Sequence, residues 1–153
     1  MSVTSVRRSS LAVLLVCCLL VVPASASAAS RHDATEAKII RALNKTRSSY
    51  GLPRLRSTRA LGRAADAHSR AMRRSNTIGH GDYSRRIRRY VRSRKVGENL
   101  AWMSGCNATS IVNMWLNSAP HRKVMLSKSF RRIGVGRSGS RKCFVTADFA
   151  SAR

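Results

Sequence analysis

The sequence predicts a single α+β domain, in which several amphipathic helices precede a C-terminal β-hairpin. Apolar residues recur at helical spacing through most of the chain, beginning with Ile39 and Leu43. Near the C-terminus the pattern changes to the alternation of strands, in the ranges 130–136 and 142–149, which a turn at residues 138–140 separates. A length of 153 residues is also that of one domain.

The first 28 residues have the pattern of a secretory signal peptide. Arg7 and Arg8 precede an apolar run from Leu11 to Val22, and Ala-x-Ala cleavage sites end at Ala26 and Ala28. A membrane-spanning helix needs about twenty apolar residues, more than this run provides. We therefore expect a secreted protein, extracellular or cell-wall associated, with no transmembrane anchor after cleavage. Residues 29–36 form a short N-terminal segment, and residues 37–150 form the folded domain.

Capping residues indicate where the first two helices begin. Asp33 or Thr35 can cap the first helix, which ends near Gly51. Ser57 can cap the second. This second helix carries His68 on its apolar face, which we interpret as a core histidine.

Three shorter helices are expected after the second. A basic helix covers residues 83–92, where apolar residues lie between arginines at helical spacing. Asn107 can cap a helix that ends before Pro120. Proline suits the first turn of a helix, so we expect a short helix to begin at His121.

The chain is strongly basic, with 30 Lys+Arg against 6 Asp+Glu and a net charge of +24. Removal of Arg7 and Arg8 with the signal peptide leaves +22. Such a charge attracts polyanions, among them anionic cell-surface polymers. A solvated arginine-rich surface of no specific function explains the scattered positions equally well. Aromatic residues are 5% of the chain and form no visible stacking platform, so we do not expect nucleic acid as a partner.

Two cysteines, Cys106 and Cys143, remain after Cys17 and Cys18 leave with the signal peptide. In an oxidising compartment such a pair predicts one disulfide. Closing a loop of about 38 residues would stabilise the fold by about 4 kcal/mol. A metal or redox pair is the alternative, although neither cysteine has another beside it.

Glu98 is the acidic residue of greatest interest, because it lies between Gly97 and the apolar Leu100. A buried carboxylate requires a cation, a metal or several hydrogen-bond donors. His80 precedes it by eighteen residues and His121 follows by twenty-three, so these two histidines are candidate partners.

The order of the motifs from Ala37 to Ala150 resembles a bacterial, secreted CAP domain, also called an SCP domain. This is the superfamily of cysteine-rich secretory proteins, venom antigens and plant pathogenesis-related proteins. The resemblance implies an α-β-α sandwich with a three- or four-stranded, mostly antiparallel sheet between helices. The motifs that carry it are the loop histidine His80, Gly97-Glu98-Asn99-Leu100, Trp115 with Ser118 and His121-Arg122, and Gly134-Val135-Gly136.

The resemblance also implies a central cavity with two histidines and two acidic residues, which in some members bind a divalent metal. By motif, His80, Glu98 and His121 occupy three of these positions. Ser118 stands where many members have the fourth, a glutamate. Two imidazoles and one carboxylate could hold zinc as three ligands with an open position for water. A hydrogen-bonded cluster that ties loops together is the alternative.

Three classes of function remain open. The first is a non-enzymatic extracellular binding or effector module, which holds a small apolar ligand or a protein partner. The second is a metal-dependent hydrolase that uses His80, Glu98 and His121. The sequence contains no H-E-x-x-H motif and no Ser-His-Asp order that would support this second class. The third is a cationic binder of cell-surface polyanions, which the charge alone supports.

Overall fold

The computed structural model describes Met1 and residues 27–152, with side chains in the first helix described from Ala34 onward. The predicted signal peptide therefore lies almost wholly outside the described residues. Among the helices that are described, none combines the length and apolar character needed to cross a membrane.

A four-stranded sheet forms the centre of the domain and confirms the predicted α+β class. Its strands are β1 (Arg56–Ser57), β2 (Val96–Ser104), β3 (Phe130–Ser138) and β4 (Lys142–Ser151), in the order β1-β3-β4-β2. The sheet is mostly antiparallel, since the parallel pair is β1 with β3. The predicted hairpin is the β3–β4 pair. The short β1 and the long β2 form the two edges, and each edge carries one of the pockets discussed below.

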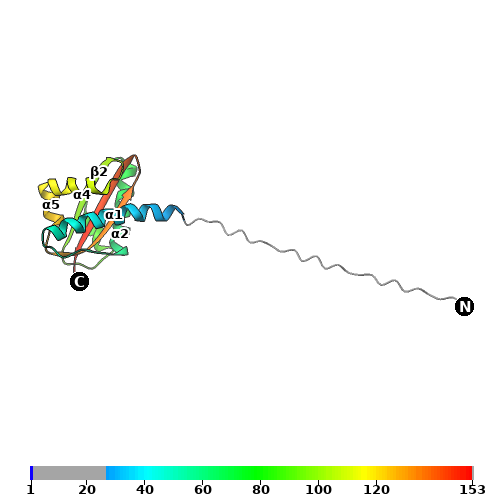
Figure 1. Ribbon diagram of the computed structural model, residues 1–153, viewed down its shortest axis with the longest axis horizontal. Coiled ribbons are helices and arrows are strands. Elements are labelled where there is room, and N and C mark those ends of the chain that lie inside the picture. Colours follow the sequence, from blue (N-terminus) through cyan, green and yellow to red (C-terminus); the bar gives the residue numbers. More distant parts are fainter. Residues whose placement is uncertain (2–26, 153) are drawn as a thin grey trace.

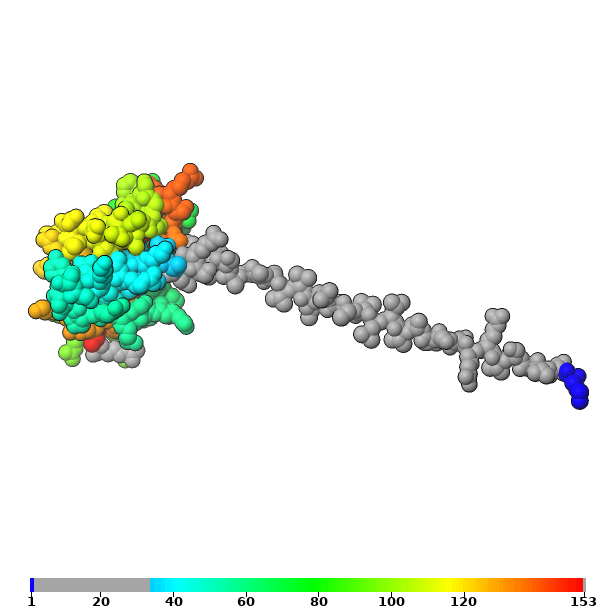
Figure 2. Space-filling model, in the orientation of Figure 1, coloured from blue at the N-terminus to red at the C-terminus, as the bar shows by residue number. Residues whose placement is uncertain are grey.

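Helices cover both faces of the sheet. They are α1 (Ser27–Ser49), α2 (Arg59–Ser75), α3 (Tyr83–Arg88), α4 (Ala108–Asn117) and α5 (Ala119–Met125). On one face α1, α4 and α5 pack over a core that includes Leu43, Trp115 and Phe149. Figure 1 shows α4 and α5 following one another beside α1, and Figure 2 shows the α1 and α4 surfaces in contact. On the other face α2 and α3 bury Leu61 and Ile87.

Two glycines of β3 allow α2 to lie directly on the sheet. A Cβ at Gly134 would lie 2.1 Å from the carbonyl carbon of Leu61, and one at Gly136 would lie 2.1 Å from the amide nitrogen of Asp66. No side chain fits at these distances. The Gly-x-Gly motif is therefore the contact surface for α2, and the Ser69 hydroxyl secures it by donating to the Gly136 carbonyl at 2.9 Å.

Several predicted helix starts are wrong by a few residues. Ser57 belongs to β1, where it pairs with Ile133, so the cap of α2 moves to Thr58. The first helix begins at Ser27, before the predicted caps Asp33 and Thr35.

Of the other predicted helix boundaries, one is confirmed and two are wrong. Asn107 caps α4 as predicted and accepts from the Ser110 amide. The basic helix α3 ends at Arg88 instead of residue 92. The last helix begins at Ala119 instead of His121, because Pro120 takes a first-turn position that needs no amide hydrogen.

The predicted disulfide is present between Cys106 and Cys143, with the two Cα atoms 5.6 Å apart. It joins the loop after β2 to the beginning of β4. Gly105 donates its amide hydrogen to the Arg141 carbonyl at 2.9 Å and holds the same two segments together. The loop after β2 is thereby fixed to the hairpin.

Candidate functional site

The candidate site is built around two buried carboxyl groups on adjacent strands. Glu98 of β2 lies opposite Asp148 of β4, and Asp148 lies opposite Gly134 of β3. Both carboxyl side chains have no exposed surface. Sequence reasoning singled out Glu98 but assigned no role to Asp148.

Arg86 supplies a positive charge to both carboxyl groups. Its Nη2 donates a hydrogen bond to Glu98 Oε2 and lies 3.6 Å from Asp148 Oδ1. Its Nη1 donates to the His80 carbonyl at 3.2 Å. Arg86 reaches this place from α3, which Asp82 caps by accepting from the Arg85 amide. The basic helix was predicted to be a solvated face, and Arg86 is the exception.

His80 contacts Glu98 directly, as the sequence predicted. The distance from Nδ1 of His80 to Oε1 of Glu98 is 2.7 Å. An ionised carboxylate only accepts, so Nδ1 carries the hydrogen and donates it. In this tautomer the lone pair lies on Nε2, which makes Nε2 of His80 a hydrogen-bond acceptor for a ligand.

His68 belongs to the same cluster and is not the core histidine that its apolar helix face suggested. Its Nε2 lies 2.9 Å from the Gly79 carbonyl and 3.9 Å from Glu98 Oε2. The carbonyl can only accept, so Nε2 donates to it. His68 therefore attaches the loop that carries His80 to helix α2.

Burial sets the protonation of the carboxyl pair. It raises the pKa of Glu98 to about 7, although the nearby Arg86 charge opposes this rise. Burial, followed by the charge of Glu98, raises the pKa of Asp148 to about 8. Neither Asp148 oxygen accepts a hydrogen bond from an N–H or O–H group of the described residues. A proton retained on Asp148 lets it donate to Glu98, which leaves one ionised carboxylate for Arg86.

His121 lies on a different wall of the site. Its Nδ1 lies 2.9 Å from Ser118 Oγ, and its carbonyl accepts from Asn99 Nδ2 at 3.0 Å. Burial lowers the pKa of His121, and the neighbouring His80 lowers it further. His80 thus acts on His121 through its charge, while the described hydrogen bonds join only His80, of these two histidines, to Glu98.

A pocket of about 360 Å³ lies between the two histidines. Its other walls come from the loop before α3, from β2 and from α4. Ile78 and Trp102 are each 49% exposed and Met114 is 38% exposed. The pocket is lined by Ile78, Gly79, His80, Leu100, Trp102, Met114 and His121.

The three-residue zinc set expected from the family resemblance does not fit this geometry. Within the part of the chain that the structure describes, no group of three His, Cys, Asp or Glu side chains is placed to hold a metal ion. Glu98 already contacts Nδ1 of His80 with one oxygen and the Arg86 guanidinium with the other. A metal ligated by Glu98 would have to displace one of these partners.

Sequence reasoning missed the part that Arg86 and Asp148 play in the site. It also missed the hydrogen bond by which His68 holds the loop that carries His80. Arg86 is one of several arginines in its segment, and nothing in their spacing distinguishes it. Asp148 is separated from Glu98 by fifty residues and meets it through strand register alone. An acidic residue inside the otherwise apolar final strand was the available signal for Asp148, because such a residue needs a buried partner.

The layered fold and the contact between the loop histidine and the β2 glutamate define a domain of the CAP class. The chain belongs to the cysteine-rich secretory protein (CAP) family, whose model matches residues 40–149. This confirms the resemblance found in the sequence.

Several proteins similar to this chain come from bacteria. It is 33% identical over 116 residues to the uncharacterized protein YkwD of Bacillus subtilis, covering 72% of this chain and 45% of YkwD. An extracellular SCP-domain protein of Bacillus anthracis has 28% identity and a TM-score of 0.73, with 79% of this chain and 41% of that chain covered. An outer surface protein of Borrelia burgdorferi has the same fold, with 22% identity, a TM-score of 0.71, and 78% and 94% of the two chains covered. The chain spans less than half the length of the curated relatives that it matches.

Proposed function

We propose that this chain is a secreted, non-enzymatic binding module. Its pocket beside His80 holds a small ligand that has an apolar body and a hydroxyl or other hydrogen-bond donor. The observation that carries this proposal is the gathering of three large, exposed apolar side chains, Ile78, Trp102 and Met114, around one pocket. Apolar patches with a few oriented polar groups are typical of ligand sites.

The polar part of the ligand would bind at His80. Glu98 fixes the ring so that Nε2 is the acceptor, and the charge of Arg86 favours the ionised form of Glu98. His121 faces the same pocket, and its lowered pKa favours the neutral ring. A ligand that donates one hydrogen bond therefore suits this pocket better than an anion or a cation.

Three observations support an extracellular or cell-wall location. The first 28 residues have the pattern of a signal peptide. The domain contains a disulfide, which is typical of oxidising compartments. Two of the similar solved structures are an extracellular protein and an outer surface protein.

Binding of 2-naphthol tests the proposal, because this probe is an uncharged aromatic alcohol that the basic surface does not attract. Naphthalene has the same apolar body without the hydroxyl. We expect Trp102→Ala to weaken both probes by about tenfold through lost contact area. His80→Ala should weaken 2-naphthol by about fivefold and leave naphthalene unchanged, because one hydrogen bond is lost.

Tyr50→Ala is the matched control, since Tyr50 is a similarly exposed aromatic residue that does not line the pocket. Its probe affinities should equal those of the wild type. Equal weakening by Tyr50→Ala and Trp102→Ala, or no saturable binding of either probe, would contradict the proposal. Calorimetric titration measures the affinity of every variant, and intrinsic fluorescence can report binding to those that retain Trp102, because Trp102 is exposed whereas Trp115 is fully buried.

A further inference from the structure

The outer face of helix α2 carries a row of arginines. The inner face of this helix lies against β3, and Arg59, Arg63, Arg70 and Arg74 are all exposed. Residues that differ by four, seven or eleven positions fall on the same face of an α-helix, so these four side chains share one face. We call these four residues the α2 row. We propose that the α2 row binds a linear phosphodiester polymer.

The positive charge of the α2 row has little compensation within the domain. None of the four side chains forms a hydrogen bond or an ion pair with a residue that the structure describes. Like charges four residues apart on a helix repel one another. Asp66 is the acidic residue of α2, and it lines the pocket between α1 and α2 together with Glu36. One acidic residue against four arginines leaves this face strongly positive, and a bound polyanion would relieve the repulsion.

The arginine-rich composition of the chain does not by itself account for the α2 row. Helix α4, on the other face of the sheet, contains no charged residue. Its exposed positions include Thr109, Ser110 and Asn113, which are neutral. Helix α3 covers the same face as α2 and adds further exposed arginines. Arginine is thus concentrated on the face that α2 and α3 cover, and exposed helical positions elsewhere do not require it.

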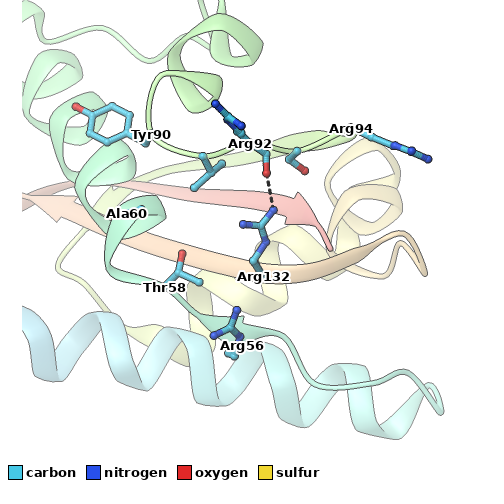
Figure 3. Close-up of a pocket in the computed structure, with 9 residues that line it drawn as sticks. Arg56, Thr58, Ala60, Tyr90, Arg92, Arg94 and Arg132 are labelled. Atoms are coloured by element: carbon cyan, nitrogen blue, oxygen red, sulfur yellow. Dashed lines mark hydrogen bonds between the residues drawn. The ribbon is translucent and has the colours of Figure 1, made fainter. Parts of the chain in front are cut away.

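The length of the α2 row favours a linear polymer over a small anion. At a rise of 1.5 Å per residue, Arg59 and Arg74 lie about 22 Å apart along the helix axis. Positive charge continues beyond the start of α2, at the pocket of about 910 Å³ that Figure 3 shows beside β1. The lining of this pocket includes Thr58, which caps α2, and the exposed Arg56 and Arg92. An extended chain of anions matches this arrangement, whereas one small anion can reach only part of it.

The chemistry of the α2 row favours phosphodiesters. All four cations are arginines, whose planar guanidinium groups bind phosphate oxygens through paired hydrogen bonds. A phosphodiester polymer carries one negative charge per repeat on a flexible chain, so its charges can adjust to the spacing of the row. A lipid bilayer is the competing partner. However, none of the exposed large apolar side chains among the described residues lies on α2, so this face has no group that would enter a membrane.

Titration of a fluorescently labelled oligomer of glycerol phosphate, at salt concentrations from about 50 to 200 mM, tests the proposal. The row variant combines Arg63→Gln, Arg70→Gln and Arg74→Gln. We expect its affinity to be at least tenfold lower than that of the wild type at the lowest salt concentration. The slope of log affinity against log salt should become shallower by about 2, because each lost phosphate contact removes about 0.7 from the slope.

The control variant combines Lys38→Gln, Arg41→Gln and Lys45→Gln, three exposed positions on α1. It removes the same charge from the helix layer on the opposite face of the sheet. Its affinity should fall by less than threefold, and its salt slope should equal that of the wild type. Equal weakening by the two variants would show that only the overall charge matters and would overturn the proposal.

Two further probes separate the phosphodiester polymer from other polyanions. Poly-L-glutamate should bind the wild type at least threefold more weakly than the glycerol phosphate oligomer, because guanidinium groups match phosphate oxygens. Equal affinity for the two polymers would overturn the assignment to phosphodiesters. Binding to phosphatidylglycerol vesicles without saturable binding of the oligomer would show that the partner is a bilayer, which also overturns it. The row variant should bind 2-naphthol like the wild type, so this result is independent of the function proposed for the His80 pocket.

Discussion

Glu98 and Asp148 lie opposite each other on β2 and β4, and both are within reach of one guanidinium, that of Arg86. Two ionised carboxylates would leave this buried cluster with a net negative charge. One proton, retained on Asp148, gives a neutral set of one carboxyl, one carboxylate and one cation. The stability of the domain should therefore depend on both the cation and the proton.

Removal of the cation should destabilise the fold. We expect Arg86→Gln to reduce the free energy of unfolding by about 3 kcal/mol at pH 8, because it leaves a buried carboxylate without a counter-charge. The loss should be smaller at pH 5, where both carboxyl groups can take up protons. Urea denaturation at the two pH values measures both effects. Arg85→Gln, which changes the exposed neighbour, is the control, and an equal effect of the two variants would show that Arg86 has no special role.

The proton retained on Asp148 should make the free energy of unfolding depend on pH. The folded-state pKa of Asp148 is raised to about 8, so the folded chain holds a proton that the unfolded chain releases near pH 4. Its contribution to stability is thus fully present below about pH 4 and is lost as the pH rises through about 8. Asp148→Asn should flatten this decline. The lowered pKa values of His68 and His121 reduce the stability of the fold as the pH falls. This effect is common to the wild type and Asp148→Asn, so it cancels when one stability curve is subtracted from the other.

Asp66→Asn provides the comparison for this titration, because Asp66 lies on α2 outside the cluster. It should shift the stability curve without changing its slope above pH 6. A wild-type curve that is already flat between pH 6 and 9 would contradict the shared-proton arrangement.

Zinc should leave the melting temperature of the wild type unchanged at pH 7.5, where imidazoles are mostly neutral. Arg86 and His80 already occupy both oxygens of Glu98, so the three-ligand set cannot form without breaking these contacts. A metal at a hundred times its dissociation constant would add about 2.7 kcal/mol and be easily seen. A rise in melting temperature that both His80→Ala and His121→Ala remove would restore the zinc site expected from the family resemblance.

The seating of α2 on β3 can be tested with two glycines that differ in their surroundings. Gly136→Ala should cost more than about 3 kcal/mol, because its Cβ would overlap the backbone of α2 at Asp66. Gly62→Ala, within α2, meets open space and should stabilise the helix by up to about 1 kcal/mol. Urea denaturation of the two variants measures both changes in the free energy of unfolding. Equal effects at the two positions would show that α2 does not approach β3 as described.

Local signals in the sequence were sufficient for several elements. The Asn107 cap lies directly before its helix, and the hairpin strands alternate on either side of a short turn. Once the predicted signal peptide is set aside, the two remaining cysteines could pair only with each other. Strand β2 was not assigned from the sequence, because Gly97 to Ala101 are all buried and leave no alternation of polar and apolar residues.

Only part of the candidate site could be predicted from the sequence, for a related reason. His80 and Glu98 stand in recognisable motifs, and the structure brings them together. Arg86 differs from Arg85 only in the direction that α3 gives its side chain. Likewise, Arg132 is buried and bound to backbone carbonyls, although the composition suggested a solvated arginine surface. Direction and register arise from tertiary packing, so neither arginine could be identified from spacing.

The disulfide between Cys106 and Cys143 makes the maturation of this domain depend on its chemical surroundings. The bond closes a loop between residues 37 apart and adds about 4 kcal/mol by the chain-entropy relation. A small domain has a total stability of about 5 to 15 kcal/mol, so this single bond is a large share of it. A copy kept among reducing thiols would lack that share and unfold more often, which would expose it to proteases. A chain exported to an oxidising compartment would therefore gain its full stability, and with it its full resistance to proteases, only after this bond has formed.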